Sequence, residues 1–468
     1  MRHPLTLYEV MKYKLSEYII PSDILDEESV VPQRIIFSSR SGISLLVKED
    51  IYNEIKQNNF SNVQSDLLDL FFKHEFIVPE SENEFEKIMT QNREDTEDLK
   101  ALSTTIQPTA NCQLGCHYCG QVHRKENMGD DLAGKIIKRI RSKMETGKFQ
   151  LLDVTWYGGE PLLGYKQIKE MTNEFHKICK ENNAEYTGFM ITNGLSLKPE
   201  IFKELYLKYD VFKFQITIDG PKEFHDDRRV TKKDRNATFD IIMRNVIDIT
   251  QLPEYQTHMQ RPILIRMNID KTNHEHINGL IDYLADKGLA DKIGLSFAPV
   301  INWGDLHFGT DDGLTKEKYA EMEIDWFIYA MKKGFNIVEL LPERAYQPCM
   351  VVDKDAEVYD TDGNVFSCYE FSYTPSYQND DYIIANLHDK NPVFNQNVTT
   401  RNWFDDLEKG AISTCHTCKL LPSCGGGCVK KWYMKNPEPA CPSFKYNMQD
   451  RLVLDYLKRN KPELLIED

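Results

Sequence analysis

The sequence of 468 residues lacks the features of a membrane or secreted protein. No apolar run approaches the roughly 20 residues of a membrane-spanning helix. The N-terminus, Met1-Arg2-His3-Pro4-Leu5, has no hydrophobic region of the signal-peptide type. An excess of positive charge is also missing, and the formal net charge of −16 argues against nucleic acids and anionic membranes as partners. We therefore expect a cytoplasmic protein with neither kind of partner.

A disulfide pattern is absent as well. The 11 cysteines are odd in number, ten of them fall in ligand-like clusters, and Cys179 stands alone in a stretch with a helical pattern. This usage fits a reducing compartment and metal binding, and we interpret Cys179 as a core thiol. The apolar content of 41% is normal for a globular protein, and the length predicts two or three domains.

The first cysteine cluster is the loop Cys112-Gln113-Leu114-Gly115-Cys116-His117-Tyr118-Cys119. Its C-x3-C-x2-C spacing is too compact for a disulfide framework, and soft thiolates favour iron–sulfur clusters, zinc or copper(I). Three thiolates around a four-iron cluster leave one iron open. The alternative is a zinc loop without its fourth ligand, for which His117 is poorly placed inside the two-residue spacer.

Downstream of Leu102, short apolar strands alternate with longer helical patterns, which is typical of parallel βαβ units. The predicted strands are 103–107, 152–157, 188–192, 212–218, 263–268 and 294–299. Over 238–249, a helix is expected because Phe239, Ile242, Met243 and Val246 share one face. Six such repeats predict a partial (β/α)6 barrel of the α/β class, with catalytic groups at the carboxyl ends of the strands.

Three of these strand ends carry residues suited to ligand binding. The second runs into Gly158-Gly159-Glu160, where glycines permit close backbone approach and a carboxylate could accept from a cationic amine. The third ends in Thr192-Asn193-Gly194, which could bind a ligand or form a capped turn. On the fifth strand we expect only one of Arg266 and Asn268 to point inward. We favour Asn268, at the barrel mouth.

The first 80 residues or so predict a small module. Two β-branched and aromatic runs, Arg34–Ser39 and Ile43–Val47, flank a turn and predict a hairpin. Helical patterns follow over Glu49–Gln57 and from a capping Ser65 onward. We expect a winged-helix-like fold here and a solvated acidic linker helix over Ser81–Lys100.

Seven further cysteines follow a helical pattern over Thr315–Lys333. They have the spacings C-x13-G-x4-C, with Gly363 as the glycine, then C-x2-C-x5-C-x3-C and a final C-x12-C. The seven are Cys349, Cys368, Cys415, Cys418, Cys424, Cys428 and Cys441. A zinc ribbon is the alternative, but two zinc ions would use eight ligands or a nearby histidine, and only His416 is available.

From about Ser103 to Phe444, these motifs resemble the radical S-adenosylmethionine (SAM) superfamily and its SPASM extension. The resemblance implies that Cys112, Cys116 and Cys119 hold a [4Fe-4S] cluster whose open iron chelates SAM and whose electron cleaves it to a 5′-deoxyadenosyl radical. It also implies two auxiliary [4Fe-4S] clusters and an electron donor such as flavodoxin or ferredoxin.

The segment Asp219-Gly220-Pro221, with His225 and Arg229 downstream, resembles a stretch of the anaerobic sulfatase-maturase-like branch. It implies that Arg229, rather than Arg228 or Arg235, pairs with the SAM carboxylate, although a surface arginine is the alternative. The implied SAM contacts are Tyr118, Gly158, Gly159, Glu160, Thr192, Asn193, Thr217, Asp219, Arg229 and Asn268.

By the same resemblance, Cys415, Cys418, Cys424 and Cys441 close one auxiliary cluster. The other three thiols of this region are left for the second auxiliary cluster. Some sulfatase maturases carry an additional cysteine where this chain has Asp355, a harder oxygen ligand. We therefore expect one auxiliary cluster to have an open or oxygen-ligated iron.

The N-terminal module resembles the leader-peptide recognition element of peptide-modifying radical SAM enzymes, in which a precursor peptide adds a strand to a sheet edge. A purely structural cap is the alternative. The expected domains are 1–80 for this module, 81–101 for the linker, 102–305 for the barrel, 306–348 for a bridging helical region, 349–445 for the iron–sulfur SPASM domain, and 446–468 for a helix and tail.

The predicted function is modification of a ribosomally made precursor peptide by hydrogen abstraction, such as thioether or other cross-link formation. One alternative is a sulfatase maturase that makes formylglycine. That branch carries an Asp directly after the second cysteine of C-x13-G-x4-C, where this chain has Tyr369 followed by Glu370. The other alternative is a non-catalytic iron–sulfur electron carrier or scaffold, against which the ligand-type strand ends speak.

Overall fold

The computed structural model describes residues 12–25, 31–256, 261–301, 313–338, 340–433 and 439–465. Its centre is a sheet in the order β11-β10-β9-β8-β7-β6-β12-β13-β14. The barrel strands are β6 (Ala101–Ile106), β7 (Leu151–Trp156), β8 (Glu185–Thr192), β9 (Val211–Thr217), β10 (Ile263–Ile269) and β11 (Gly294–Pro299). All six are parallel to their neighbours, which confirms the predicted α/β barrel.

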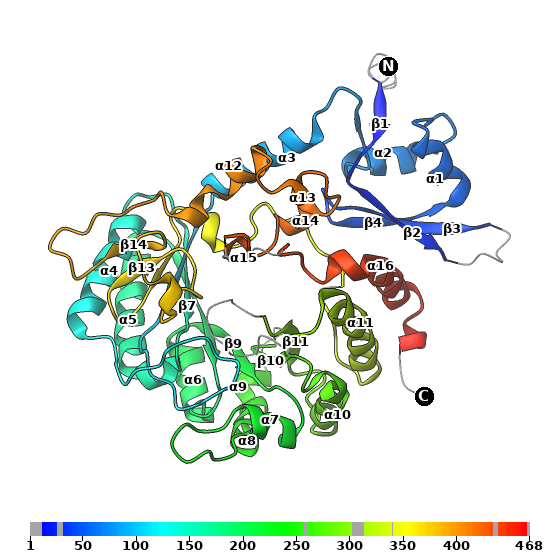
Figure 1. Cartoon of the computed structure of the whole chain (residues 1–468). Coiled ribbons are helices and arrows are strands. Elements are labelled where there is room, and N and C mark those ends of the chain that lie inside the picture. Colours follow the sequence, from blue (N-terminus) through cyan, green and yellow to red (C-terminus); the bar gives the residue numbers. More distant parts are fainter. Residues whose placement is uncertain are drawn as a thin grey trace.

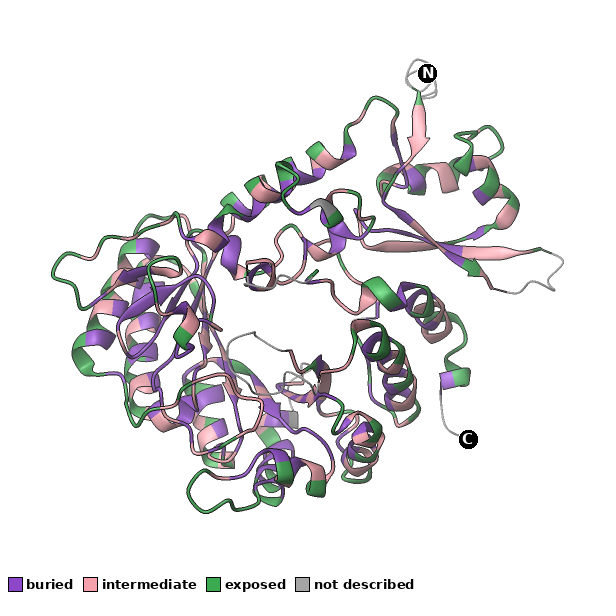
Figure 2. Cartoon of the chain, viewed as in Figure 1, coloured by how far each residue is buried: buried purple, intermediate pink, exposed green. Residues whose placement is uncertain are grey.

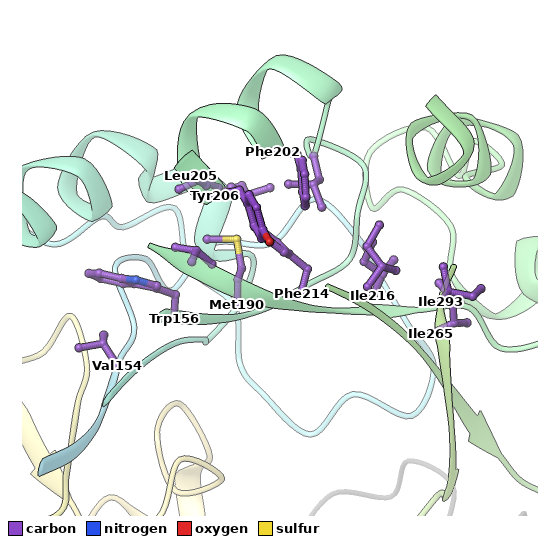
Figure 3. Close-up of a cluster of buried hydrophobic side chains, with 14 of the residues drawn as sticks. Val154, Trp156, Met190, Phe202, Leu205, Tyr206, Phe214, Ile216, Ile265 and Ile293 are labelled. Carbon is purple, nitrogen blue, oxygen red and sulfur yellow. The ribbon is translucent and has the colours of Figure 1, made fainter. Parts of the chain in front are cut away.

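Helices cover the outer face of this sheet (Figure 1). They are α4 (Asp130–Met144), α5 (Tyr165–Glu181), α6 (Pro199–Lys208), α8 (Phe239–Thr250), α10 (Ile277–Asp286) and α11 (Lys316–Lys332). Figure 3 shows Trp156, Met190 and Phe214 from the strands in one cluster with Phe202 from α6, whose ring centroid lies 4.9 Å from that of Phe214. Each is fully buried, and full burial of such a side chain contributes roughly 1.5–3 kcal/mol.

Two details of the barrel core match the sequence patterns. The four apolar residues that share one face of α8 are all buried, at the predicted position of the helix. Cys179 lies buried on α5 within the main apolar cluster, as expected of a core thiol.

The second cysteine region extends the barrel sheet. Its strand β12 (Glu357–Tyr359) runs parallel to β6, and β13 (Asn364–Phe366) and β14 (Ile383–Asn386) follow in antiparallel pairing. Beyond β6, Gln107 N donates to Tyr359 O over 2.9 Å. This region therefore begins directly beside the loop that holds the first three cysteines. Strands of three or four residues were too short for the sequence pattern to indicate.

The N-terminal module holds the predicted hairpin. Its three-stranded antiparallel sheet has the order β2 (Ile19–Ile24), β3 (Gln33–Ser38), β4 (Ile43–Lys48), beside α1 (Glu49–Lys56) and α2 (Ser65–Lys73). A separate pair joins β1 (Tyr13–Leu15) to β5 (Ile77–Pro79). The prediction of Ser65 as a helix cap is wrong, because Gln64 occupies that position without a side-chain cap and Ser65 is the first helical residue.

The expected solvated linker is a packed helix, α3 (Glu84–Glu97), so that expectation is also wrong. Its buried residues are Glu84, Ile88, Met89, Asn92 and Thr96. The buried Arg40 guanidinium of the module lies 2.7 Å from Glu82 and 2.9 Å from Glu84. These ion pairs neutralise acidic side chains at the start of α3, the helix that connects the module to the rest of the chain.

The C-terminal part packs against the N-terminal sheet. Helix α16 (Phe444–Asn460) contacts α11, β2 and β3, and Figure 1 shows it in red beside the blue module. Ile35 and Phe37 of β3 share an apolar cluster with Leu420, Met448 and Leu452. The shorter helices are α7 (Lys222–Arg228), α9 (Pro253–Gln256), α12 (Trp403–Glu408), α13 (Ser413–His416), α14 (Leu421–Cys424) and α15 (Val429–Trp432).

Burial follows this architecture in Figure 2, where the strands of the barrel are largely purple and the outward faces of the surrounding helices green. None of the helices in the described ranges combines the length and the apolar character needed to cross a membrane. The expected boundary between barrel and bridging region, at 305/306, lies outside the described residues.

Candidate active site

The three-cysteine loop follows β6 at the carboxyl end of the barrel sheet. Cys112 is buried, and Cys116 and Cys119 are half-buried. Leu114 N donates to Cys112 Sγ over 3.4 Å, and the Asn193 side-chain amide donates to the same sulfur over 3.8 Å. The loop is therefore shaped around its sulfur atoms and is tied to the end of β8.

The Gly-Gly-Glu segment lies directly against this loop. Gly158 and Gly159 have φ values of +82° and +52°, and a Cβ on Gly159 would lie 2.3 Å from Asn111 O. Glu160 N then donates to Asn111 O over 2.8 Å. Only glycine fits this close approach of two backbones, so the strand end after β7 and the residue before Cys112 form one unit.

The Glu160 carboxylate accepts three hydrogen bonds from other residues of the protein. It accepts from the Thr192 hydroxyl over 2.6 Å, from Asn193 N over 2.7 Å and from Leu162 N over 3.1 Å. Burial raises the pKa of this carboxyl group, and the three hydrogen bonds oppose that shift. The carboxylate thus holds the ends of β7 and β8 together. A cationic amine at this place would meet the adjacent backbone carbonyls.

Tyr118, between the second and third cysteines of the loop, joins the loop to two further strands. Its hydroxyl donates to Asp219 over 2.6 Å and accepts from Arg229 over 2.5 Å and from Asn268 over 3.0 Å. Burial is the main cause that raises the pKa of this phenol well above its usual range. Four of the residues predicted to contact SAM therefore meet at one oxygen atom.

The two arginines after Asp-Gly-Pro have different partners, and neither is a surface residue. Arg228 forms two hydrogen bonds of 2.8 Å with the Asp270 carboxylate at the end of β10. Arg229 has no such ion pair among the described residues. Burial raises the pKa of Cys116, and the positive charge of Arg229 opposes that shift. Arg229 is thus the arginine turned toward the cysteine loop, and its pairing with the SAM carboxylate stays a prediction.

One expectation about β10 is wrong. Residues two apart on a strand lie on the same face, and Arg266 Nε donates to Asn268 Oδ1 over 3.0 Å. Both side chains therefore point into the barrel, on the face opposite the buried Ile265 and Met267. Thr217, the remaining predicted contact, ends β9, is 8% exposed, and lies beside Arg266 in register.

His225 is fully buried, and its sequence motif predicted no role for it. Its Nδ1 accepts from Asp219 N over 3.3 Å, so its Nε2–H donates to the Thr238 hydroxyl over 3.1 Å, and that hydroxyl donates to Arg229 O over 2.7 Å. Burial holds the pKa of the imidazole well below its usual range. This neutral histidine fixes the backbone on both sides of the Asp219–Arg229 segment.

The seven later cysteines form two groups. Cys415, Cys418, Cys424 and Cys441 line one shared cavity. In the second group, burial raises the pKa of Cys349, and the negative charge of Cys428 raises it further. Burial likewise raises the pKa of Cys368, and the charge of Cys349 adds to that shift. The resemblance assigned the same four and three thiols to two auxiliary clusters, and that assignment stays a prediction.

Three residues near the second group bear on the remaining expectations. The Asp355 carboxylate lies 2.7 Å from Lys148 Nζ. Tyr369 packs edge to face on Tyr157, with ring centroids 5.2 Å apart, and the Tyr157 hydroxyl donates to Glu370 over 3.5 Å. The position after Cys368 thus faces the strand end that carries the Gly-Gly-Glu segment.

Comparison with known proteins gives this site a family. Residues 106–253 match the Radical SAM superfamily. These residues of the barrel therefore form a radical SAM domain. It is 22% identical over 387 residues to the serine-type anaerobic sulfatase-maturating enzyme of Bacteroides thetaiotaomicron, a match that covers 72% of this chain and 85% of that enzyme.

Solved structures show the same fold. Native anSMEcpe with bound AdoMet is similar with a TM-score of 0.56 and 18% identity, over 78% of this chain and 98% of that one. The same protein with bound AdoMet and the Kp18Cys peptide gives a TM-score of 0.57 and 19% identity, over 76% and 99% of the two chains. The fold is thus that of the radical SAM/SPASM maturases, as the sequence motifs indicated.

A radical SAM domain implies SAM and a SAM-binding [4Fe-4S] cluster, and the loop fits that group. One of its three thiols, that of Cys112, accepts from two N–H donors, as is typical of cluster sulfurs. Within the described ranges, no three His, Cys, Asp or Glu side chains gather as a cage for a single metal ion.

Proposed function

We propose that this protein is a radical SAM/SPASM enzyme that modifies a ribosomally made precursor peptide, with thioether or another side-chain cross-link as the product. The N-terminal module binds the peptide, and the barrel takes a hydrogen atom from one of its residues. Cys112, Cys116 and Cys119 hold the SAM-binding cluster, whose electron cleaves SAM to the 5′-deoxyadenosyl radical.

The observation that carries this proposal is the attachment of the N-terminal sheet to the second cysteine region. The Ser39 hydroxyl donates to Lys419 O over 2.5 Å, and the Ser423 hydroxyl donates to Ser39 O over 3.0 Å. Both partners lie between ligand-type cysteines, Cys418 and Cys424. A peptide held by this sheet would therefore begin close to the cysteine region that adjoins the barrel mouth.

The sheet also offers an edge for such a peptide. Strand β4 pairs with β3 and with no other strand among the described residues. Glu49 N donates to Pro32 O, so by alternation along the register the N–H groups of Ser44, Leu46 and Lys48 point away from β3. Outward N–H groups on an edge strand are the ones to which an extended peptide adds.

We assign the seven later cysteines to two auxiliary [4Fe-4S] clusters. The four thiols around the shared cavity hold one, and the group of Cys349, Cys368 and Cys428 holds the other, nearer the barrel. When bound, the auxiliary clusters would supply the electron acceptor that oxidative bond formation in the peptide needs. A flavodoxin or ferredoxin supplies the reducing electron.

The chain's own residues position the reaction. Arg229 and Thr217 bind the SAM carboxylate or ribose, and Tyr118 fixes Arg229 relative to the cysteine loop. Tyr157 and Tyr369 pack on each other at the end of β7, where they would lie beside a bound peptide.

The test uses anaerobically reconstituted protein, a reductant, SAM and a short peptide encoded beside the gene. Mass spectrometry should show loss of a hydrogen pair from the peptide, with 5′-deoxyadenosine formed in proportion. The second candidate, a sulfatase maturase, is favoured by the curated relative. Conversion of a Cys- or Ser-containing sulfatase peptide to formylglycine, without reaction of the neighbouring peptide, would establish it instead. Absence of 5′-deoxyadenosine under all conditions would favour an electron carrier.

A further inference from the structure

Arg266 is a cation inside the barrel that none of the assigned SAM contacts requires. It lies on β10, beside Thr217 of β9 and Ser296 of β11. Its side chain shares the inward face with Asn268, which reaches the Tyr118 hydroxyl. The guanidinium therefore projects into the space that the barrel strands enclose, close to the predicted reaction centre.

The charge of Arg266 is unmatched. Within the described part of the chain, its guanidinium has one hydrogen bond, to the neutral Asn268 side chain, and no carboxylate at ion-pair distance. Two buried arginines elsewhere meet carboxylates: Arg228 lies 2.8 Å from Asp270, and Arg451 lies 2.5 Å from Glu323. A third, Arg401, donates to the backbone carbonyls of Asp353 and Ala356. Since a half-buried cation is costly without a partner, the terminal N–H groups of Arg266 are available to an anionic ligand.

The neighbours of Arg266 lie outside the cysteine loop. Burial raises the phenol pKa values of Tyr157, Tyr369 and Tyr319, and the Arg266 charge opposes each shift. These tyrosines come from the end of β7, the second cysteine region and α11. The charge of Arg229, by contrast, acts on Cys116 and Cys119 of the cluster loop. The two arginines thus face different ligands.

We propose that Arg266 is a specificity-determining residue that binds a carboxylate of the peptide substrate, an Asp or Glu side chain or the C-terminus, near the residue that is modified. This inference rests on the proposed peptide-modifying function. A guanidinium offers paired N–H donors that match a carboxylate. The ring faces and hydroxyls of Tyr157 and Tyr369 beside it suit the rest of a peptide.

The test is a selection from displayed random peptides on immobilised, reconstituted, SAM-loaded full-length protein. Wild type should enrich Asp and Glu over Asn and Gln by about tenfold at one position, the size expected of one charge-assisted pair. Arg266→Gln should remove this preference, and Arg266→Glu should turn it toward Lys and Arg. Arg244→Glu, the same charge change at an exposed position of α8, should select like wild type.

Three results would overturn the inference. The same acidic preference in all variants would show that Arg266 does not read the peptide. A weaker SAM affinity of Arg266→Gln with unchanged peptide selection would assign Arg266 to the SAM carboxylate. No peptide enriched by any protein, wild type included, would reject the proposed function and this inference with it. Circular dichroism and retained SAM binding establish that the variants compared are folded.

Discussion

The Tyr118 hydroxyl donates to the Asp219 carboxylate over 2.6 Å and so joins the cysteine loop to the end of β9. The same oxygen accepts from Arg229 and Asn268. Both residues belong to the predicted SAM site, so this one hydroxyl sets the distance between the cluster ligands and the groups that bind SAM. The site depends on this oxygen more than on any single carboxylate.

Tyr118→Phe should weaken SAM binding by about tenfold to a hundredfold, because hydrogen bonds to charged groups contribute roughly 1.5–3 kcal/mol. Asp219 would lose a donor and Arg229 its acceptor. The measurement is the SAM dissociation constant of the reconstituted protein. Tyr165→Phe is the matched control, since it removes a hydroxyl that donates to Glu204 far from the loop. An unchanged dissociation constant in Tyr118→Phe would contradict the assigned role.

Replacing Cys112, Cys116 and Cys119 together by Ala should abolish reductive SAM cleavage and leave the iron of the second cysteine region in place. The two regions ligate separate clusters in this interpretation. Iron content and 5′-deoxyadenosine are measured on the same samples. Cys179→Ala, which changes a buried thiol outside both regions, serves as the control. Undiminished 5′-deoxyadenosine from the triple variant would end the radical interpretation of this loop.

Leu46→Pro should weaken peptide binding and spare SAM cleavage without substrate. The Leu46 N–H points away from β3, so proline there removes a donor from the free edge and keeps the pairing with β3. Leu46→Ala, which shortens the same exposed side chain and retains the N–H, should bind the peptide like wild type. Equal peptide affinities of the two variants would leave the module a structural role, as would unchanged peptide affinity after removal of residues 1–79.

Periodicity predicted the barrel because its strands are long and its helices carry broad apolar faces. The expected strands agree with β6 to β11 to within three residues at each end. The cysteine spacings could be read without a fold, since ligand spacing is a local property. The division of the second region into four and three thiols likewise followed from resemblance to a family and not from periodicity.

What could not be predicted depends on contacts between distant residues. The sequence around the acidic linker did not indicate that Arg40 would form an ion pair with Glu84. The sequence around Glu160 did not indicate that its carboxylate would accept a hydrogen bond from Asn193 N, at the end of β8. The role of His225 depends on Thr238, which is 13 residues away. The motif Asp-Gly-Pro-x-x-x-His-Asp did carry a usable signal, because a histidine next to such a turn can cap its backbone.

The buried His225 predicts a loss of stability in acid. Its pKa lies well below the usual value of about 6.5 in the folded protein. Below about pH 6.5 the histidine of the unfolded chain binds a proton that the native chain does not bind. The free energy of unfolding therefore falls by up to about 1.4 kcal/mol for each pH unit of acidification. His225→Asn should reduce stability at neutral pH by roughly 1–3 kcal/mol and flatten this pH dependence.

Denaturant unfolding of the reconstituted protein between about pH 7.5 and about pH 5.5 measures this difference. His388→Asn, at an exposed position, should keep the wild-type slope. The comparison between variants removes the contribution of cluster ligands, which all of them share. Equal slopes for wild type and His225→Asn would mean that this imidazole is not the group that titrates.

The last prediction concerns the group of Cys349, Cys368 and Cys428. Three thiols cannot fill four ligand positions of a cubane cluster. The candidate oxygen ligand, Asp355, forms an ion pair with Lys148. Its backbone N–H donates to the Asp353 carboxylate. We therefore expect this auxiliary cluster to present an iron without a ligand from the chain. A substrate thiolate would fill it, and the iron would keep that sulfur deprotonated and fixed for thioether formation.

Mössbauer spectra of the iron-57 protein, with and without a cysteine-containing peptide, test this expectation. One iron subsite should change when the peptide binds, and a matched peptide with Ser in place of Cys should leave it unchanged. Asp355→Asn should have the same spectrum as wild type, because its carboxylate serves Lys148 instead of iron. Four cysteine sulfurs of this chain on both auxiliary clusters would refute the prediction. An open iron indifferent to the thiol would refute only its proposed part in thioether chemistry.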